Sequence, residues 1–238
     1  MTKKNSILII IPARGGSKGV KLKNLRKVLN KNLLQIAIEF SKKLNVSNYI
    51  CVSSDHKKIL KIAEENNVLA IKRPFNLSLD YVSDYKVIEH SIKYLEKKLN
   101  IDFNFIIYLQ PTSPFRKKKD LIFSLKKVMK NSFDASFSVS KASLKYHPKK
   151  IFKFKQNSRS IELYLKSGSK IVARQQLDNI CIRNGIFYIF NKKKLLIKKT
   201  IYLDKIYPYF INYNYVNIDS LKDLALSRKI AKFNKLDF

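Results

Sequence analysis

The sequence predicts an α/β protein with a mostly parallel central sheet flanked by helices, and two observations near its start carry that prediction. First, apolar runs of strand length alternate with segments of helical periodicity, in the order strand, helix, strand, helix, strand within 71 residues. Second, the opening apolar run at residues 7–11 is followed by Pro12 and three glycines. That pattern is typical of a loop leaving the carboxyl end of a buried parallel strand, where open α/β sheets bind ligands.

Length and composition indicate a globular protein with an ample core. The chain has 238 residues, 45% of them hydrophobic, enough for one large domain or two small ones. No apolar run approaches the length of a membrane span, and the opening run lacks the cleavage site of a signal peptide. We therefore expect a cytoplasmic protein with no membrane partner. The two cysteines, Cys51 and Cys181, lie in apolar runs without CxxC spacing, which predicts buried free thiols.

The net charge of +32, from 49 Lys and Arg against 17 Asp and Glu, is typical of proteins that bind nucleic acid or another acidic partner. The lysines are nevertheless spread over the whole chain, which is also rich in Asn, Ile, Phe and Tyr. All of these residues have AT-rich codons, so genome composition can account for much of the charge. No nucleic-acid motif is recognisable. We expect no nucleic-acid partner, with a basic nucleic-acid-binding protein as the alternative.

Periodicity and turn residues place the elements of the first half. The apolar spacing predicts helices over residues 32–44, 56–67 and 83–99, with Ser54 or Asp55 able to cap the second. It predicts strands over residues 49–52, 68–71 and 103–109. The last strand ends in a polar loop, residues 110–116, whose two prolines forbid a helix or a central strand. This second loop is expected beside the first.

The second half begins with a predicted helix over residues 121–129 and a strand over 135–139. Alternating residues then predict a β-hairpin with its turn near residues 156–158, within an excursion from the core at 140–171. A core strand over 182–190 is expected to bend at Asn184-Gly185. A strand over 208–216 and a helix over 221–232, capped by Ser220, complete a single domain of residues 1–238.

The loop after the first strand has the composition of a phosphate-binding loop. Its glycines, Gly15, Gly16 and Gly19, allow a ligand to approach the backbone, and five basic residues supply positive charge: Arg14, Lys18, Lys21, Lys23 and Arg26. Neither the GxGxxG nor the GxxxxGK[ST] spacing is present, which disfavours dinucleotide binding and P-loop ATPase chemistry. At a low-dielectric sheet end each charge has a larger effect.

Six blocks of sequence together resemble one enzyme family. Residues 11–19, IPARGGSKG, and the following Lys23-Asn24-Leu25 are similar to the opening motif of the CMP-N-acylneuraminate synthetases, the cytidylyltransferases of sialic acid and related nonulosonic acids. The other blocks follow in the family's order over nearly the whole chain: Arg73-Pro74, LQPTSPFR at 109–116, Arg174-Gln175-Gln176, Asn184-Gly185 with Tyr188, and Asp219.

The resemblance implies a Rossmann-like nucleotidyltransferase fold and a defined reaction. CTP would activate a nine-carbon 2-keto sugar acid, giving the CMP-sugar and pyrophosphate, with Mg²⁺, in a homodimer to which the excursion at 140–171 contributes. The alternatives keep the chemistry but change the sugar to legionaminate, pseudaminate or a Kdo-like acid. A catalytically inactive homologue is a further alternative.

The resemblance also assigns roles to particular residues. It implies that Arg14 and Lys18 hold the triphosphate, that Lys23 and Asn24 contact phosphate or ribose, and that Arg73 lies by the cytosine. The full nucleotide-binding set is Ala13, Arg14, Gly15, Gly16, Ser17, Lys18, Lys23, Asn24, Arg73 and Ser83. The sugar-binding set is Gln110, Arg174, Gln175 and Tyr188, in which the Arg174 guanidinium can pair bidentately with the sugar carboxylate. The catalytic set is Arg14, Lys18, Lys23 and Asp219.

The metal site departs from the family pattern. The family usually has Asp-x-Asp where this chain has Asn217-Ile218-Asp219. Because Mg²⁺ prefers carboxylate and phosphate oxygens, an amide at one of two ligand positions removes a charge. We expect Asp219, with Asn217, to hold Mg²⁺ more weakly than two aspartates would. The alternative role for Asp219 is a cap of the last helix.

Overall fold

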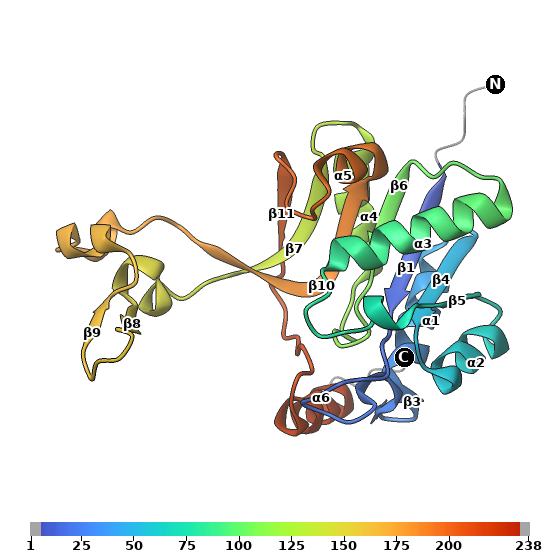
Figure 1. Ribbon diagram of the computed structural model, residues 1–238, viewed down its shortest axis with the longest axis horizontal. Coiled ribbons are helices and arrows are strands. Elements are labelled where there is room, and N and C mark those ends of the chain that lie inside the picture. The colour runs from blue at the N-terminus through green and yellow to red at the C-terminus, as the bar shows by residue number, and fades with distance from the viewer. Residues whose placement is uncertain (1–5, 234–238) are drawn as a thin grey trace. The chain divides into compact units, whose positions relative to one another are not determined.

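A computed structural model, which describes residues 6–233, shows a seven-stranded, mostly parallel sheet flanked by helices (Figure 1). The strand order is β11-β7-β10-β6-β1-β4-β5. The pairs β1/β4, β1/β6 and β4/β5 are parallel, whereas β10 is antiparallel to β6. The predicted α/β class is therefore confirmed.

The elements lie close to their predicted positions. The strands are β1 (Ile7–Pro12), β2 (Lys27–Val28), β3 (Lys31–Asn32), β4 (Tyr49–Ser54), β5 (Leu69–Lys72), β6 (Phe105–Tyr108), β7 (Ala135–Lys141), β8 (Phe152–Phe154), β9 (Ile161–Leu163), β10 (Cys181–Asn191) and β11 (Ile206–Phe210). The α-helices are α1 (Leu33–Leu44), α2 (Lys57–Glu65), α3 (Asp84–Leu99), α4 (Lys118–Met129), α5 (Lys192–Lys198) and α6 (Leu221–Phe233).

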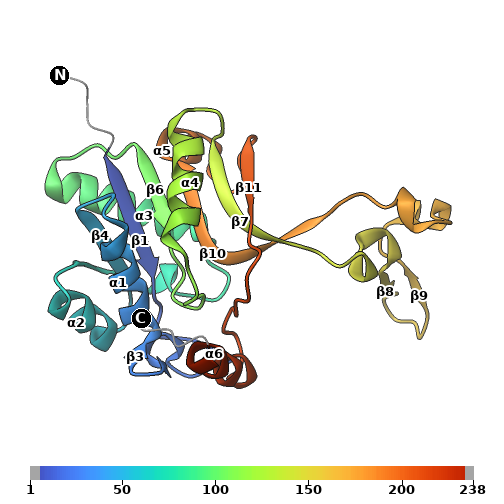
Figure 2. The ribbon, with the colours of Figure 1, turned by 180° about the vertical axis from the view of Figure 1, so that it is seen from behind.

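Helices cover both faces of the sheet. In Figure 1 α3 crosses the front of the sheet, and the reverse view in Figure 2 brings α1 and α4 to the front. Strand β1 is thus covered on both sides, and its residues Leu8 to Ile11 are fully buried. This explains why its sequence is continuously apolar rather than alternating.

The chain divides into two compact units. The first comprises residues 1–138, 185–209 and 213–238, and the second comprises residues 139–184 and 210–212. The second unit contains the predicted excursion and its hairpin, in which β8 pairs antiparallel with β9. Asn157, in the predicted turn, has a left-handed φ of 55°, which asparagine tolerates well.

A capping box explains where α1 begins, whereas α2 lacks the cap that the sequence predicted. Asn32 and Gln35 form a reciprocal capping box at the start of α1. Neither Ser54 nor Asp55 caps α2, whose first flanking residue is His56 with no side-chain cap. The expected cap is therefore wrong, because the Asp55 carboxylate instead accepts a hydrogen bond from Gly15 N at 2.8 Å.

Three further expectations need correction or refinement. The strand expected over 208–216 is instead β11, which begins at Ile206 and ends at Phe210; the last backbone bond toward β7 is from Ile211 N to the Val139 carbonyl. Strand β10 is continuous through Gly185, whose φ of 74° supplies the local bend. Cys51 is buried as expected, but Cys181 is exposed, because it begins β10 in the second unit, outside the core.

None of the described helices is long and apolar enough to cross a membrane.

The burial of β1 predicts a large cost for truncating one of its side chains. Ile10 is fully buried, and its substitution by Ala is expected to lower the free energy of unfolding by about 2–5 kcal/mol through lost apolar burial and the cavity left behind. Urea denaturation measures this. The matched control is Ile197→Ala on α5, where the side chain is 64% exposed and a change within about 0.5 kcal/mol is expected. Equal losses in the two variants would contradict the assigned core.

Candidate active site

A pocket of about 610 Å³ opens at the carboxyl ends of β1 and β6. This is the end at which open α/β sheets bind ligands, where neighbouring strand connections diverge. Its walls come from four places in the chain: the loop after β1, the segment between β5 and α3, the loop after β6, and the residues before α6. The first loop contributes three cations, Arg14, Lys18 and Lys23, to one side of the pocket.

Two glycines of the first loop are required by the protein's own packing. A Cβ on Gly19 would lie 2.3 Å from the backbone oxygen of Asp219, and a Cβ on Gly15 would lie 2.8 Å from the His56 ring. Gly16, in contrast, faces open space. The sequence predicted that all three glycines allow a ligand to approach the backbone. The structure shows that Gly19 instead leaves room for the backbone of Asp219.

Asn24 and Lys23 hold the first loop in place. Asn24 is buried and its amide donates to the Arg14 carbonyl at 3.0 Å, which closes the loop upon itself. The preceding Leu22 has a left-handed φ of 51°, so the chain turns sharply here. Lys23 then extends its Nζ to within 2.8 Å of Asp219 Oδ1.

Alternating burial directs Asn217 and Asp219 into the pocket. Val216 and Ile218 are buried in an apolar cluster beneath α6, and Ile218 N donates to the Thr112 carbonyl at 2.8 Å. Since neighbouring side chains of an extended segment point in opposite directions, the residues between and after them, Asn217 and Asp219, face the pocket that they line.

The cap of α6 is formed without the Asp219 carboxylate. Asp223 N donates to Ser220 Oγ, and Ser220 N donates to Asp223 Oδ2 at 2.8 Å. The Ser220 hydroxyl, with further donors around it, lowers the pKa of the Asp223 carboxyl. Ser220 is therefore the helix cap that the sequence predicted, and the alternative capping role for Asp219 is excluded.

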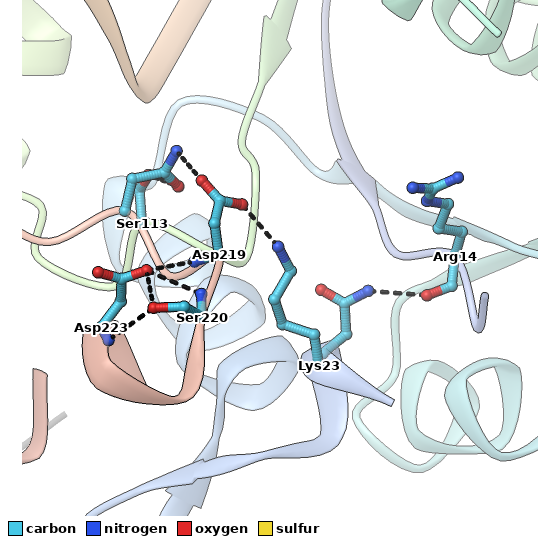
Figure 3. A network of polar contacts seen from close by, with 8 residues as sticks. Arg14, Lys23, Ser113, Asp219, Ser220 and Asp223 are labelled. Atoms are coloured by element: carbon cyan, nitrogen blue, oxygen red, sulfur yellow. Dashed lines mark hydrogen bonds and ion pairs between the residues drawn. The ribbon is translucent and has the colours of Figure 1, made fainter. Parts of the chain in front are cut away.

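A chain of polar contacts joins the second loop to the first (Figure 3). Ser113 Oγ donates to Asn217 Oδ1 at 3.3 Å, and Asn217 Nδ2 donates to Asp219 Oδ2 at 3.3 Å. The other oxygen of Asp219 pairs with Lys23. Asn217 thus uses both ends of its amide to orient the one carboxylate of this motif.

The residues present fit a Mg²⁺ ion only if a nucleotide supplies most of its ligands. No group of three or more His, Cys, Asp or Glu suited to a metal exists among residues 6–233. Asp219 offers an exposed carboxylate, while Asn217 Oδ1 is engaged by Ser113. Because Mg²⁺ commonly binds one or two carboxylates together with phosphates and water, Asp219 is a sufficient protein anchor for such an ion.

The pocket lining also contains buried polar groups. Arg73 is 5% exposed, and its guanidinium donates to the Ser53 carbonyl at 2.7 Å and to Ser53 Oγ at 3.1 Å. Burial lowers the pKa of Arg73. The Tyr108 hydroxyl donates to Asp84 at 2.9 Å, and burial, followed by the charge of Asp84, raises the pKa of Tyr108 well above its usual value.

Two functional contacts are absent from the sequence predictions. Arg116 Nε donates to the Ile186 carbonyl at 2.8 Å and its Nη2 donates to the Gln110 carbonyl, so that it fixes the second loop against β10. Burial lowers the pKa of Arg116 to about 9, which leaves it charged at neutral pH. Asp80 bridges Arg14 and Lys18 at 2.6 and 2.5 Å. Its only signal in the sequence was its place in the polar segment after Arg73.

Most of the predicted nucleotide-binding residues line the pocket. The residues brought together there are Arg14, Ser17, Lys18, Lys23, Asn24, Arg73, Gln110, Asn217 and Asp219. Ala13, Gly15 and Gly16 belong to the same loop without lining the pocket, and Ser83 caps α3 by accepting from Lys86 N. Tyr188 is buried beside Tyr108, with ring centroids 6.4 Å apart. Arg174 and Gln175 are exposed in the second unit. The ligand contacts of all these residues stay predictions.

A cationic, glycine-containing loop thus lies at the carboxyl end of a mostly parallel sheet, and a solved structure shares this fold. The CMP:2-keto-3-deoxy-manno-octonic acid synthetase solved with CTP superposes with a TM-score of 0.71 at 14% identity, over 98% of this chain and 100% of that one. The fold is therefore that of the nucleotidyltransferases.

Sequence comparison identifies the family within that class. The cytidylyltransferase family profile matches residues 8–232, and the chain belongs to this family. Its relatives include the pseudaminic acid cytidylyltransferase of Campylobacter jejuni, 28% identical over 95% of this chain and 97% of the relative. The CMP-N,N'-diacetyllegionaminic acid synthase of Legionella pneumophila is also 28% identical, over 96% and 97%. The resemblance to cytidylyltransferases of nonulosonic acids is confirmed.

The contact between Gly19 and Asp219 predicts a selective effect of added side-chain volume. Gly19→Ala must displace the backbone of Asp219, so we expect a loss of about 1–3 kcal/mol in unfolding free energy and at least a tenfold fall in kcat/KM. Urea denaturation and steady-state kinetics measure the two effects. The matched control is Gly16→Ala, for which open space predicts little change in stability. Equal destabilisation of both variants would contradict the packing role of Gly19.

Proposed function

We propose that this cytidylyltransferase transfers the cytidylyl group of CTP to a nonulosonic acid and releases pyrophosphate. The observation that carries the proposal is the convergence of Arg14, Lys18, Lys23 and Asp219 on one pocket in a chain of this family. The names of the two relatives support a nonulosonic acid as the acceptor, and pseudaminate and legionaminate gain weight among the alternatives.

The reaction needs charge and alignment more than covalent catalysis. The 2-hydroxyl oxygen of the sugar would form a bond to the α-phosphorus of CTP while the bond to the bridging oxygen of pyrophosphate breaks. The hydroxyl proton passes to solvent water, and the electron pair of the broken P–O bond remains on pyrophosphate. Arg14 and Lys18, which line the pocket, would bind the β- and γ-phosphates, where negative charge develops, and Lys23 pairs with Asp219. Fixed cations in a preorganised loop lower the barrier without reorganising during the reaction.

Mg²⁺ is part of the proposal, with Asp219 as its protein anchor. A bound Mg²⁺ would supply positive charge to the phosphates of CTP. Asn217 would keep the Asp219 carboxylate oriented through its amide, and Lys23 would be shared between that carboxylate and the nucleotide. The neutral Asn217 leaves the protein with one charged ligand, which predicts weak metal affinity before CTP binds.

We also propose a cytoplasmic homodimer, because CTP is a cytoplasmic metabolite and the second unit exposes many apolar side chains. Among the most exposed are Phe152 at 53%, Phe154 at 83%, Tyr164 at 59% and Val172 at 88%. Exposed apolar groups in one small unit are typical of a protein interface. The sugar contacts proposed for Gln110, Arg174, Gln175 and Tyr188 belong to the same assembly.

A panel of acceptor acids tests the proposed reaction. Purified enzyme with CTP and Mg²⁺ is expected to release pyrophosphate with pseudaminate, a legionaminate derivative or N-acetylneuraminate, and more slowly with UTP or ATP in place of CTP. Coupled phosphate detection follows the release, and mass spectrometry identifies the CMP-sugar. Inactivity with every acid, including Kdo, would contradict the proposal. CTP binding without turnover would instead favour the inactive homologue, and salt-sensitive duplex binding the nucleic-acid alternative.

Restoring the second carboxylate tests the metal proposal. Asn217→Asp is expected to lower the Mg²⁺ concentration for half-maximal activity about three- to tenfold, because a second charged oxygen joins the metal site. Titration of activity with Mg²⁺ at saturating CTP measures it. Asn157→Asp, in the exposed hairpin turn, makes the same change of charge outside the pocket and is expected to have no effect. An unchanged Mg²⁺ dependence for Asn217→Asp would show that Asn217 does not limit metal binding.

A further inference from the structure

The acidic side chain of Asp80 occupies the cations of the proposed phosphate site. Its Oδ1 lies 2.6 Å from Arg14 Nη1 and its Oδ2 lies 2.5 Å from Lys18 Nζ, so each carboxylate oxygen pairs with a different residue of the loop after β1. Hydrogen bonds from Lys18 and Arg14 lower the pKa of this carboxyl, which therefore carries its negative charge at neutral pH. Like a phosphate group, this carboxylate is an anion that accepts charge-assisted hydrogen bonds from Arg and Lys side chains.

The same two cations cannot be fully used by Asp80 and by a triphosphate together. Charge-assisted hydrogen bonds require each donor within about 3 Å of its acceptor. The Arg14 guanidinium and the Lys18 ammonium each have several N–H donors, but the donors directed at Asp80 are not available to a second anion while that pairing holds. A phosphate that uses the same donors of the two cations has to displace the carboxylate from them.

The segment that carries Asp80 is attached loosely enough to move. Among the described residues, the backbone donors of residues 75–82 that bond other backbone groups do so locally: Leu77 N to Pro74, Ser78 N to Phe75 and Val82 N to Leu79. Phe75 and Tyr81 are 79% and 84% exposed. The ion pairs of Asp80 are thus the principal polar link from this segment to the loop after β1.

We propose that Asp80 is an internal competitor of the substrate's phosphates, which pairs with Arg14 and Lys18 in the empty enzyme and is displaced when CTP binds. This inference rests on the proposed function for the identity of the ligand. It predicts two states of segment 75–82, one closed onto the loop and one released. It also predicts that Asp80 weakens the binding of any ligand that uses these two cations.

The competition favours release of the product. Pyrophosphate retains the β- and γ-phosphates and so remains on Arg14 and Lys18 after the bond to the α-phosphorus has broken. As pyrophosphate departs, the Asp80 carboxylate returns to both cations, and its ion pairs replace those that pyrophosphate made. The enzyme thereby exchanges one anion for another without exposing two unpaired cations at once.

Binding measurements on Asp80→Asn and Asp80→Ala test the proposal. We expect both variants to bind CTP and inorganic pyrophosphate about 3- to 20-fold more tightly than the wild type, because each partly exposed ion pair contributes up to about fivefold in an equilibrium constant. The affinity for cytidine, which has no phosphate, should stay unchanged. Isothermal titration calorimetry with each ligand gives the constants. Pyrophosphate should also inhibit the variants more strongly than the wild type.

The matched control is Asp204→Asn, which removes one carboxylate from an exposed ion pair with Lys198 outside the pocket. It should leave all three affinities unchanged. Unchanged or weaker pyrophosphate binding in both folded Asp80 variants, with folding checked by thermal denaturation, would overturn the competitor role. Pyrophosphate needs only the cations, so this arm still tests Asp80 if CTP does not bind. A wild type that binds pyrophosphate but not CTP would contradict the proposed function alone.

Discussion

The close approach of the segment before α6 to the loop after β1 is the constraint on which the site depends. Gly19 has no side chain because the Asp219 backbone occupies that space, and Ile218 N is hydrogen-bonded to the Thr112 carbonyl of the second loop. Burial of Val216 and Ile218 holds the segment there. Three chain segments more than 90 residues apart are thereby fixed at one point, and Asn217 and Asp219, which alternate with the buried residues, line the pocket.

Several charged side chains of the pocket have polar partners within the pocket itself. Asp219 pairs with Lys23, Asp80 pairs with Arg14 and Lys18, and Asp84 accepts from the Tyr108 hydroxyl. Binding of an anion at such a site exchanges ion pairs rather than creating them, so the affinity for the proposed triphosphate would depend on how much better it fits the cations than the carboxylates do. Partial solvent exposure keeps each internal pair weak, and this makes the exchange possible.

Apolar periodicity was sufficient to predict the fold, but the contacts of the site depend on residues distant in sequence. The alternation of buried strand and amphipathic helix placed β1, α1 and α3 within one or two residues, since each pattern is local. The errors involve competing partners. Asp55 is a residue type that commonly caps helices. Its carboxylate instead accepts a hydrogen bond from Gly15 N, 40 residues earlier in the chain. Arg116 and Asp80 likewise act on groups 70 and more than 60 residues away, for which the sequence carries no spacing signal.

Asn217 stands where the family usually has an aspartate, and this difference changes the hydrogen bonding of the site as well as its charge. A carboxylate at this position could accept from Ser113 but could not donate to Asp219, whereas the amide does both. The amide therefore removes one charged oxygen from the metal site and, in return, fixes the orientation of the carboxylate that remains. A site with one oriented carboxylate has little affinity for a free hydrated Mg²⁺ ion, which keeps several waters, but it suits an ion already chelated by phosphates. If Asp219 anchors Mg²⁺ as proposed, metal and nucleotide should enter this pocket together, with Asp219 binding the metal–nucleotide complex rather than the free ion.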